Sequence, residues 1–246
     1  MPLQTAPRKP SRLFMAGRRL KGSIVSYCEG KPMLRKTLGL AHAHLLPLVV
    51  AIALMASGGA RAGEHEDWCF ADQEKTPEEA LTGCTALIEG GKLSQDKLAT
   101  AYANRCLVHT QRKASDLAIA DCTQAIAIEP GNALAYAQRG EAYCGKGDVK
   151  RCVADFNEAM RIDPGDPSFT FLRGMARADA GDTDGAIADL TKAIEQDPGT
   201  VAAYVRRGRI YEAEGDKARA AADYRSALKI DPYDETAKQR LEGFSK

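Results

Sequence analysis

A period of 34 residues organises residues 99–234. Proline recurs at this step in phrases of similar sequence, at Pro130, Pro164, Pro198 and Pro232. Self-similarity at a fixed period of this length indicates a repeat architecture, in which a unit buries its apolar face only by stacking on its neighbours.

Apolar and small residues return at helical spacing inside each unit. In residues 133–166 a first helical face carries Tyr136 and Gly140, and a second face, after a turn at 145–148, carries Phe156. The closing proline cannot continue a helix and separates one unit from the next. Each unit is therefore predicted to be a pair of helices joined by a short turn.

These positions resemble the tetratricopeptide repeat family, whose pattern is aromatic, Gly, aromatic, then Ala, aromatic, Ala and Pro. Units 133–166 and 201–234 follow it closely; the other two depart from it at Cys106, His109, Cys122, Thr170, Arg177 and Leu190. The resemblance implies an all-α fold, an α-solenoid of stacked helix-turn-helix hairpins with a right-handed superhelix. The four repeats are expected at 99–132, 133–166, 167–200 and 201–234.

Two flanking segments complete the expected stack. Residues 80–84 echo residues 118–122, which indicates a degenerate N-terminal helical unit at 63–98. Residues 235–246 are polar and are expected to form a capping helix, because the open end of a solenoid needs a soluble face.

The segment from Leu38 to Met55 is apolar and lacks charged residues, follows basic residues, and precedes the small-x-small sequence at 60–62. This pattern is typical of a cleaved signal peptide, here 33–62 with cleavage after Ala62. A retained membrane anchor is the alternative. The basic stretch 1–32 is interpreted as a start-site artefact, with translation beginning at Met33, or as an extended n-region.

Charge is divided unevenly along the chain. Residues 63–246 hold 24 Lys and Arg against 32 Asp and Glu, a net charge of −8. An acidic body repels phosphate backbones, so nucleic acid is not an expected partner. The signal peptide separately predicts a periplasmic or secreted protein with no stable membrane anchor after cleavage.

Six cysteines lie after the signal segment: Cys69, Cys84, Cys106, Cys122, Cys144 and Cys152. An even number in an exported chain suggests disulfides, with fifteen possible connectivities. Hairpin geometry favours the local pairs 69–84, 106–122 and 144–152. The alternative is that Cys122 and Cys152 are free, small core residues.

Arginine and aspartate also keep the period, and each aspartate follows its arginine by 16 residues. The residues are Arg105 and Asp121, Arg139 and Asp155, Arg173 and Asp189, and Arg207 and Asp223. A catalytic carboxylate would not be copied four times, so we expect a structural ladder within or between units. Exposed rungs would each contribute at most about 1 kcal/mol.

Motifs for chemistry are not found. The sequence has no Cys-x-x-Cys, His-Glu-x-x-His, Gly-x-Ser-x-Gly or P-loop pattern, and His109 takes an aromatic core position. We therefore expect no catalysis and no cofactor or metal site.

The remaining candidate is a binding surface on the first helices of the repeats, which line a concave groove in solenoids. Helical projection places these residues there: Leu107, Leu134, Ala137, Glu141, Phe171, Leu172, Met175, Val205, Arg206 and Arg209. An exposed apolar cluster at Phe171, Leu172 and Met175 would mark a contact site. The alternative is that Phe169, Phe171 and Leu172 fill the seam between units.

The resemblance and the groove together predict a non-catalytic adaptor of the bacterial envelope that binds a protein or peptide segment, aliphatic or amphipathic in character. A structural protein that self-associates through the solenoid ends, as a homo-oligomer, is the second hypothesis. An enzyme with an unrecognised site is the third.

Overall fold

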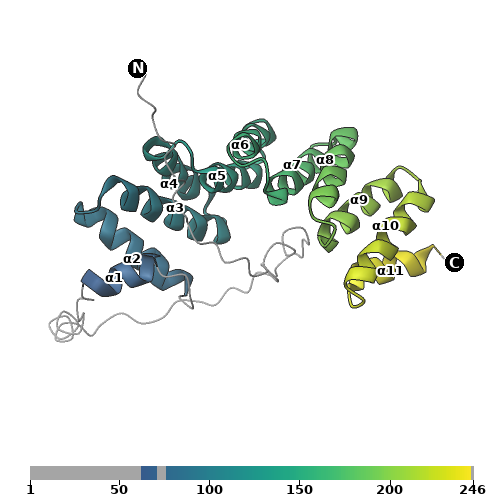
Figure 1. Ribbon diagram of the computed structural model, residues 1–246, viewed down its shortest axis with the longest axis horizontal. Coiled ribbons are helices and arrows are strands. Elements are labelled where there is room, and N and C mark those ends of the chain that lie inside the picture. Colours follow the sequence, from purple (N-terminus) through teal and green to yellow (C-terminus); the bar gives the residue numbers. More distant parts are fainter. Residues whose placement is uncertain (1–61, 71–75, 245–246) are drawn as a thin grey trace, which may run out of the picture. The chain divides into compact units, whose positions relative to one another are not determined.

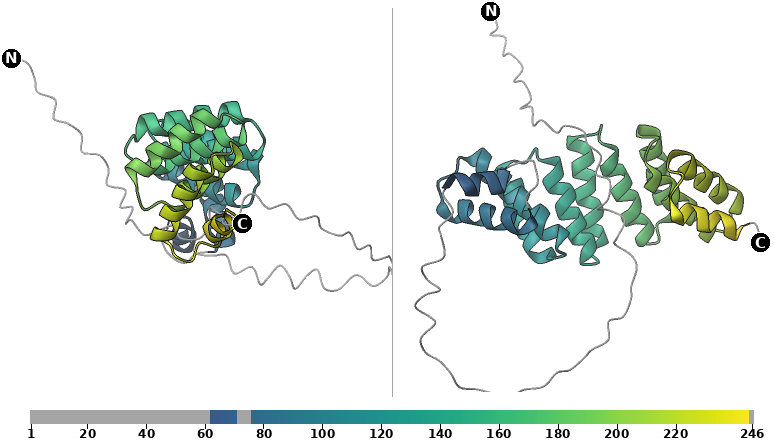
Figure 2. Two further views of the ribbon diagram at one scale, coloured as in Figure 1. Left: turned by 90° about the vertical axis from the view of Figure 1, so that its right-hand side faces the viewer. Right: turned by 90° about the horizontal axis from the view of Figure 1, so that it is seen from below.

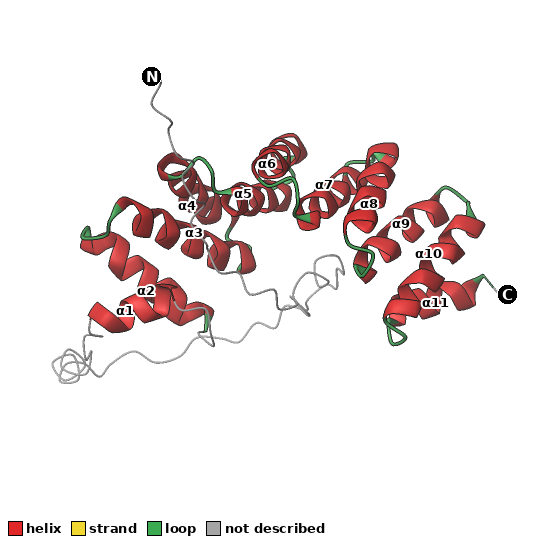
Figure 3. Ribbon diagram, viewed as in Figure 1, coloured by secondary structure: helices red, strands yellow, loops and turns green. Residues whose placement is uncertain are grey.

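The computed structural model describes residues 62–70 and 76–244, and within these ranges the chain forms eleven α-helices and no strand (Figures 1 and 3). The predicted signal peptide and the stretch 1–32 lie outside the described residues, apart from Ala62. The helices are α1 (Ala62–Phe70), α2 (Pro77–Gly90), α3 (Gln95–Gln111), α4 (Ser115–Ile128), α5 (Ala133–Gly145), α6 (Val149–Ile162), α7 (Pro167–Asp179), α8 (Thr183–Gln196), α9 (Val201–Ala213), α10 (Lys217–Ile230) and α11 (Glu235–Gly243).

Consecutive helices pair into five hairpins, from α1–α2 to α9–α10. The two helices of a hairpin contact each other along their length, and the second helix of each hairpin also contacts the first helix of the next (Figure 2). The result is an all-α solenoid, and α11 packs on α10. The first helix of the hairpin predicted at 99–132 begins earlier, at Gln95, because the Ser94 side chain accepts a hydrogen bond from the Lys97 amide and caps it there.

The turn inside each of the last four hairpins needs one residue with positive φ. This residue keeps the 34-residue step: Lys113 (φ 59°), Gly147 (78°), Gly181 (80°) and Gly215 (82°). The next residue caps the second helix where it is aspartate; Asp148, for example, accepts from the Arg151 amide at 3.1 Å. In the α3–α4 turn Ala114 replaces the aspartate and provides no side-chain cap.

A glycine on each of the first helices α5, α7 and α9 lets the second helix approach closely. A Cβ added at Gly140 would lie 3.3 Å from Phe156 Cε1, and one added at Gly208 would lie 2.9 Å from Tyr224 Cε1. In the α3–α4 hairpin the two equivalent residues are Cys106 and Cys122, and they form a disulfide. A covalent bond thus occupies the place that a glycine and an aromatic ring occupy in α5–α6 and α9–α10.

Three disulfides join the two helices of the first three hairpins. They connect Cys69 with Cys84, Cys106 with Cys122, and Cys144 with Cys152, at Cα–Cα distances of 4.7, 5.4 and 5.2 Å. These are the local pairs that the sequence favours, so Cys122 and Cys152 are not free core thiols. Within residues 62–70 and 76–244, no helix combines the length and hydropathy that crossing a bilayer requires.

Candidate functional site

The first helices of neighbouring hairpins touch directly, α3 with α5 and α7 with α9. We use the name first-helix face for those side chains of α3, α5, α7 and α9 that do not pack between the two helices of a hairpin. It consists of Leu107, Leu134, Glu141, Leu172, Met175, Val205, Arg206 and Arg209.

Two leucines make this face apolar on its N-terminal side. Leu107 of α3 is 39% exposed and Leu134 of α5 is 37% exposed. They are two of only five large hydrophobic side chains exposed among the described residues. Because α3 and α5 are in contact, the two leucines lie on adjoining helices.

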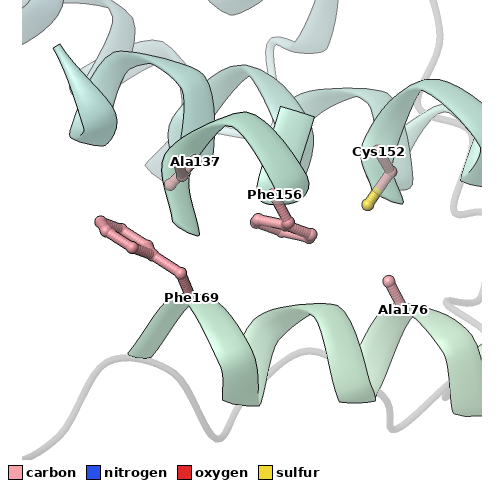
Figure 4. Close-up of a cluster of buried hydrophobic side chains, with 6 residues drawn as sticks. Ala137, Cys152, Phe156, Phe169 and Ala176 are labelled. Atoms are coloured by element: carbon pink, nitrogen blue, oxygen red, sulfur yellow. The ribbon is translucent and has the colours of Figure 1, made fainter. Parts of the chain in front are cut away.

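Phe171, expected in the groove as part of an exposed apolar cluster, is buried instead. It is 8% exposed and packs in a cluster with Leu190 and Ile194 of α8 and with Ala203 of α9. Ala137, also expected in the groove, is 4% exposed and packs with Phe156 and Phe169 (Figure 4). Phe171 fills the seam between hairpins, as the alternative interpretation states, and the expectation that Ala137 lines the groove is also wrong because that side chain is buried.

The burial of the Phe169 and Phe171 rings follows from the absence of a tyrosine at position 170. Tyr136 and Tyr204 each pack against two neighbouring core clusters, but Thr170 occupies the equivalent position in α7. The residues on either side of Thr170 take over this packing, because Phe169 enters one of the adjoining clusters and Phe171 enters the other. Helical projection alone could not show this exchange.

The other apolar members of the face are half-buried. Leu172 and Met175 pack against the cluster formed by α7, α8 and α9, and Leu172 also packs against that of α5, α6 and α7. Val205 packs against the C-terminal cluster. They line the surface without forming the protruding cluster expected from the sequence. The apolar centre of the face is therefore at Leu107 and Leu134.

The charged members of the face are Glu141, Arg206 and Arg209. Within residues 62–70 and 76–244, no hydrogen bond or ion pair involves the side chain of any of the three. Glu141 and Arg206 are half-buried, whereas Arg209 is exposed. Burial raises the pKa of the Glu141 carboxyl.

The arginine–aspartate ladder is present in all four repeats and is buried rather than exposed. Each arginine donates two parallel hydrogen bonds to the aspartate of its own hairpin, at distances from 2.6 to 2.9 Å. The aspartates are only 4–6% exposed. These bonds raise the pKa of Arg105, Arg139 and Arg207. Breaking a buried bidentate pair costs about 3–5 kcal/mol, more than the value for exposed rungs.

Each ladder arginine also reaches the second helix of the preceding hairpin through its Nη1 atom. The acceptors are Thr85 (3.3 Å), Thr123 (3.3 Å), Asn157 (2.6 Å) and Thr191 (2.8 Å). The last three keep the 34-residue step, two positions after the ladder aspartate, and this periodicity could have identified them. The ladder thus ties helices within and between hairpins.

Two hairpins give the ladder aspartate a second basic neighbour. Arg177 Nη1 donates to Asp189 Oδ2 at 2.8 Å, and His109 Nε2 lies 3.6 Å from Asp121 Oδ2. Burial lowers the pKa of His109, although Asp121 partly opposes this. The described part of the chain has no group of three or more His, Cys, Asp or Glu side chains placed to hold a metal ion.

Models of the tetratricopeptide repeat match the chain at residues 133–166 and 171–235. Among solved structures the chain is similar to YrrB, described as a TPR protein with an unusual peptide-binding site. The identity is 21% and the TM-score 0.55, over 68% of this chain and 84% of YrrB.

Two further solved structures are similar. One is TTC0263, a thermophilic TPR protein of Thermus thermophilus, at 21% identity and a TM-score of 0.56, over 68% of this chain and 89% of that one. The other is MamA from Desulfovibrio magneticus, at 16% identity and a TM-score of 0.57, over 65% of this chain and 88% of that one. No curated protein sequence matches the chain. These similarities establish the fold.

Proposed function

Because the chain belongs to the tetratricopeptide repeat family, we propose that it is a non-catalytic interaction scaffold whose first-helix face binds a segment of another protein. The observation that carries the proposal is the pair Leu107 and Leu134, exposed on two adjoining helices. Exposed apolar side chains that gather on one surface mark contact sites, and solenoids use the face of their first helices for this purpose.

Unpaired charges support the same face. Glu141 and Arg206 are half-buried without partners among the described residues, and burial of the Glu141 carboxylate costs free energy in the isolated protein. A ligand that supplies an opposite charge would offset this cost. The similar protein YrrB is described as having a peptide-binding site of its own, which is consistent with this use of the fold.

We further propose that the scaffold works in the bacterial envelope, in the periplasm or outside the cell. Three disulfides within the described residues support this location, since structural disulfides persist in oxidising compartments. The predicted signal peptide supports it as well. Maleimide labelling of cysteine thiols, in intact cells and in the denatured protein, tests the location. Cysteines held in disulfides do not react until they are reduced, so extensive labelling before reduction would contradict the proposed location.

The binding face is tested by cross-linking in envelope fractions. The Leu107→Ser, Leu134→Ser variant is compared with the native protein and with Leu117→Ser, a matched control that removes a leucine 55% exposed on α4. We expect the native protein and the control to capture the same partner and the double variant to lose it at least about tenfold.

Two outcomes would contradict the proposal. If the folded double variant captures the partner as well as the native protein does, the contact lies on another face. If every form captures only copies of itself, self-assembly replaces the scaffold function. Circular dichroism shows that each variant is folded.

A further inference from the structure

Glu141 is an acidic side chain in surroundings that oppose its charge. It is half-buried on α5, and no cation contacts it in residues 62–70 or 76–244. Burial is the one cause of the raised pKa of its carboxyl, with no charged neighbour contributing. A desolvated carboxylate without a cation destabilises the folded chain, and such groups are found where binding needs them.

The equivalent positions of the two adjoining repeats are apolar. The residues 34 positions before and after Glu141 are Leu107 on α3 and Met175 on α7. Leu134, two turns earlier on α5, lies on the same side of that helix. In the last hairpin the equivalent residue is Arg209, so Glu141 is the single anion in this register of the four repeats.

We propose that Glu141 binds a lysine or arginine side chain of the partner segment, whose flanking residues are apolar and pack on Leu107, Leu134 and Met175. This inference rests on the proposed function, because it assigns the chemistry of the segment that the first-helix face binds.

Charge complementarity selects this occupant. When a bound segment excludes water from the face, an ammonium or guanidinium group forms a charge-assisted hydrogen bond with the carboxylate. The folded body carries a net charge of −8 over residues 63–246, which favours the approach of a basic segment. A metal ion would need several oxygen ligands, and the described residues contain no group of three or more His, Cys, Asp or Glu side chains that could hold one.

The test uses selection from a phage library of random 12-residue peptides on the full-length, disulfide-bonded protein. Four forms are compared: native, Glu141→Gln, Glu141→Lys, and the matched control Glu195→Gln, which changes an exposed carboxylate on the second helix α8. We expect the native and control proteins to enrich peptides with a Lys or Arg between apolar residues. Glu141→Gln loses the basic preference, and Glu141→Lys replaces it with Asp or Glu.

A double-mutant cycle in solution then measures the interaction between Glu141 and the basic side chain of the peptide. The best synthetic peptide and its Lys→Gln or Arg→Gln form are titrated into the native protein and the Glu141→Gln variant. We expect the peptide substitution to weaken binding at least about tenfold on the native protein and less than about twofold on the variant.

The possible failures are distinct. If the native protein selects peptides without basic residues, or if the peptide substitution has the same effect on both proteins, the assignment of Glu141 is wrong while the proposed function stands. If none of the four folded forms selects any peptide, the proposed function itself fails, and this inference fails with it.

Discussion

The hairpins α3–α4 and α9–α10 have the same architecture but are held together differently. In α9–α10, Gly215 takes the positive φ of the turn, Asp216 caps the second helix, and Gly208 packs against Tyr224. In α3–α4 the turn has Lys113 at φ 59° and Ala114 without a side-chain cap, while Cys106 and Cys122 form a disulfide.

The comparison shows that a covalent bond can replace local folding signals. A left-handed non-glycine residue costs about 1–2 kcal/mol, and a missing helix cap costs about 1 kcal/mol. A disulfide that closes a loop of this length contributes about 3 kcal/mol. Within the described residues α1–α6 have one disulfide per hairpin and α7–α10 have none, so only the N-terminal hairpins should respond to reduction.

The largest expected effect comes from removing the ring that holds α9–α10. Tyr224 is fully buried, and its hydroxyl donates to Glu212 Oε2 at 2.7 Å. Tyr224→Ala should lower the free energy of unfolding by about 3–5 kcal/mol, because it leaves a cavity, whereas Tyr224→Phe should cost only about 1 kcal/mol.

Hydrogen exchange read by mass spectrometry locates this effect. Loss of protection should be confined to α9, α10, α11 and the adjoining α8, with or without a reducing agent. Equal loss in α3–α4 would show that the two hairpins unfold as one unit and that the comparison does not hold.

An intermediate effect is expected from removing the disulfide of α3–α4. Cys106→Ala, Cys122→Ala should cost about 3 kcal/mol in urea unfolding. The variant Cys106→Gly, Cys122→Phe copies the pair found at Gly140 and Phe156, and it should recover much of the loss without a covalent bond. If it is no more stable than the alanine variant, the two arrangements are not interchangeable.

The smallest expected effect comes from moving the turn signals between hairpins. Lys113→Gly, Ala114→Asp gives α3–α4 the turn of α9–α10 and should raise the free energy of unfolding by about 2 kcal/mol. The reciprocal change, Gly215→Lys, Asp216→Ala, should lower it by a similar amount. Thermal melts under oxidising conditions measure the stability of both variants. If the first variant is not stabilised and the second is not destabilised, the argument is contradicted.

Much of the fold is predictable because the spacing of a few residues determines it. The repeated prolines, the glycines at the helix contact and the ladder pairs such as Arg139 and Asp155 all keep one period. Reading them together gives the hairpins and their order. The repeat period does not determine the start of α3 at Gln95, because this start depends on a single capping side chain, Ser94, outside the repeated pattern.

The candidate site was less predictable, because exposure depends on volumes contributed by several helices. Helical projection places Leu107, Leu134 and Glu141 on the surface, where the structure has them exposed or half-buried. It fails for Phe171, since only the packed structure shows that Thr170 leaves space for the rings beside it. The absence of a cationic partner for Glu141 is equally hard to predict from the sequence, because it depends on the side chains of every helix packed around it.

The third contact of each ladder arginine has a consequence for the arrangement of repeats. Every arginine needs a hydroxyl or amide acceptor on the preceding hairpin, two residues after that hairpin's aspartate or its equivalent. On α10 this position is Arg225, which offers a guanidinium instead. A further repeat with the same arginine would face like charge there, while one inserted after α4, α6 or α8 would meet a threonine or an asparagine. These acceptor side chains therefore favour the insertion of a repeat between existing hairpins and disfavour the addition of one directly after α10.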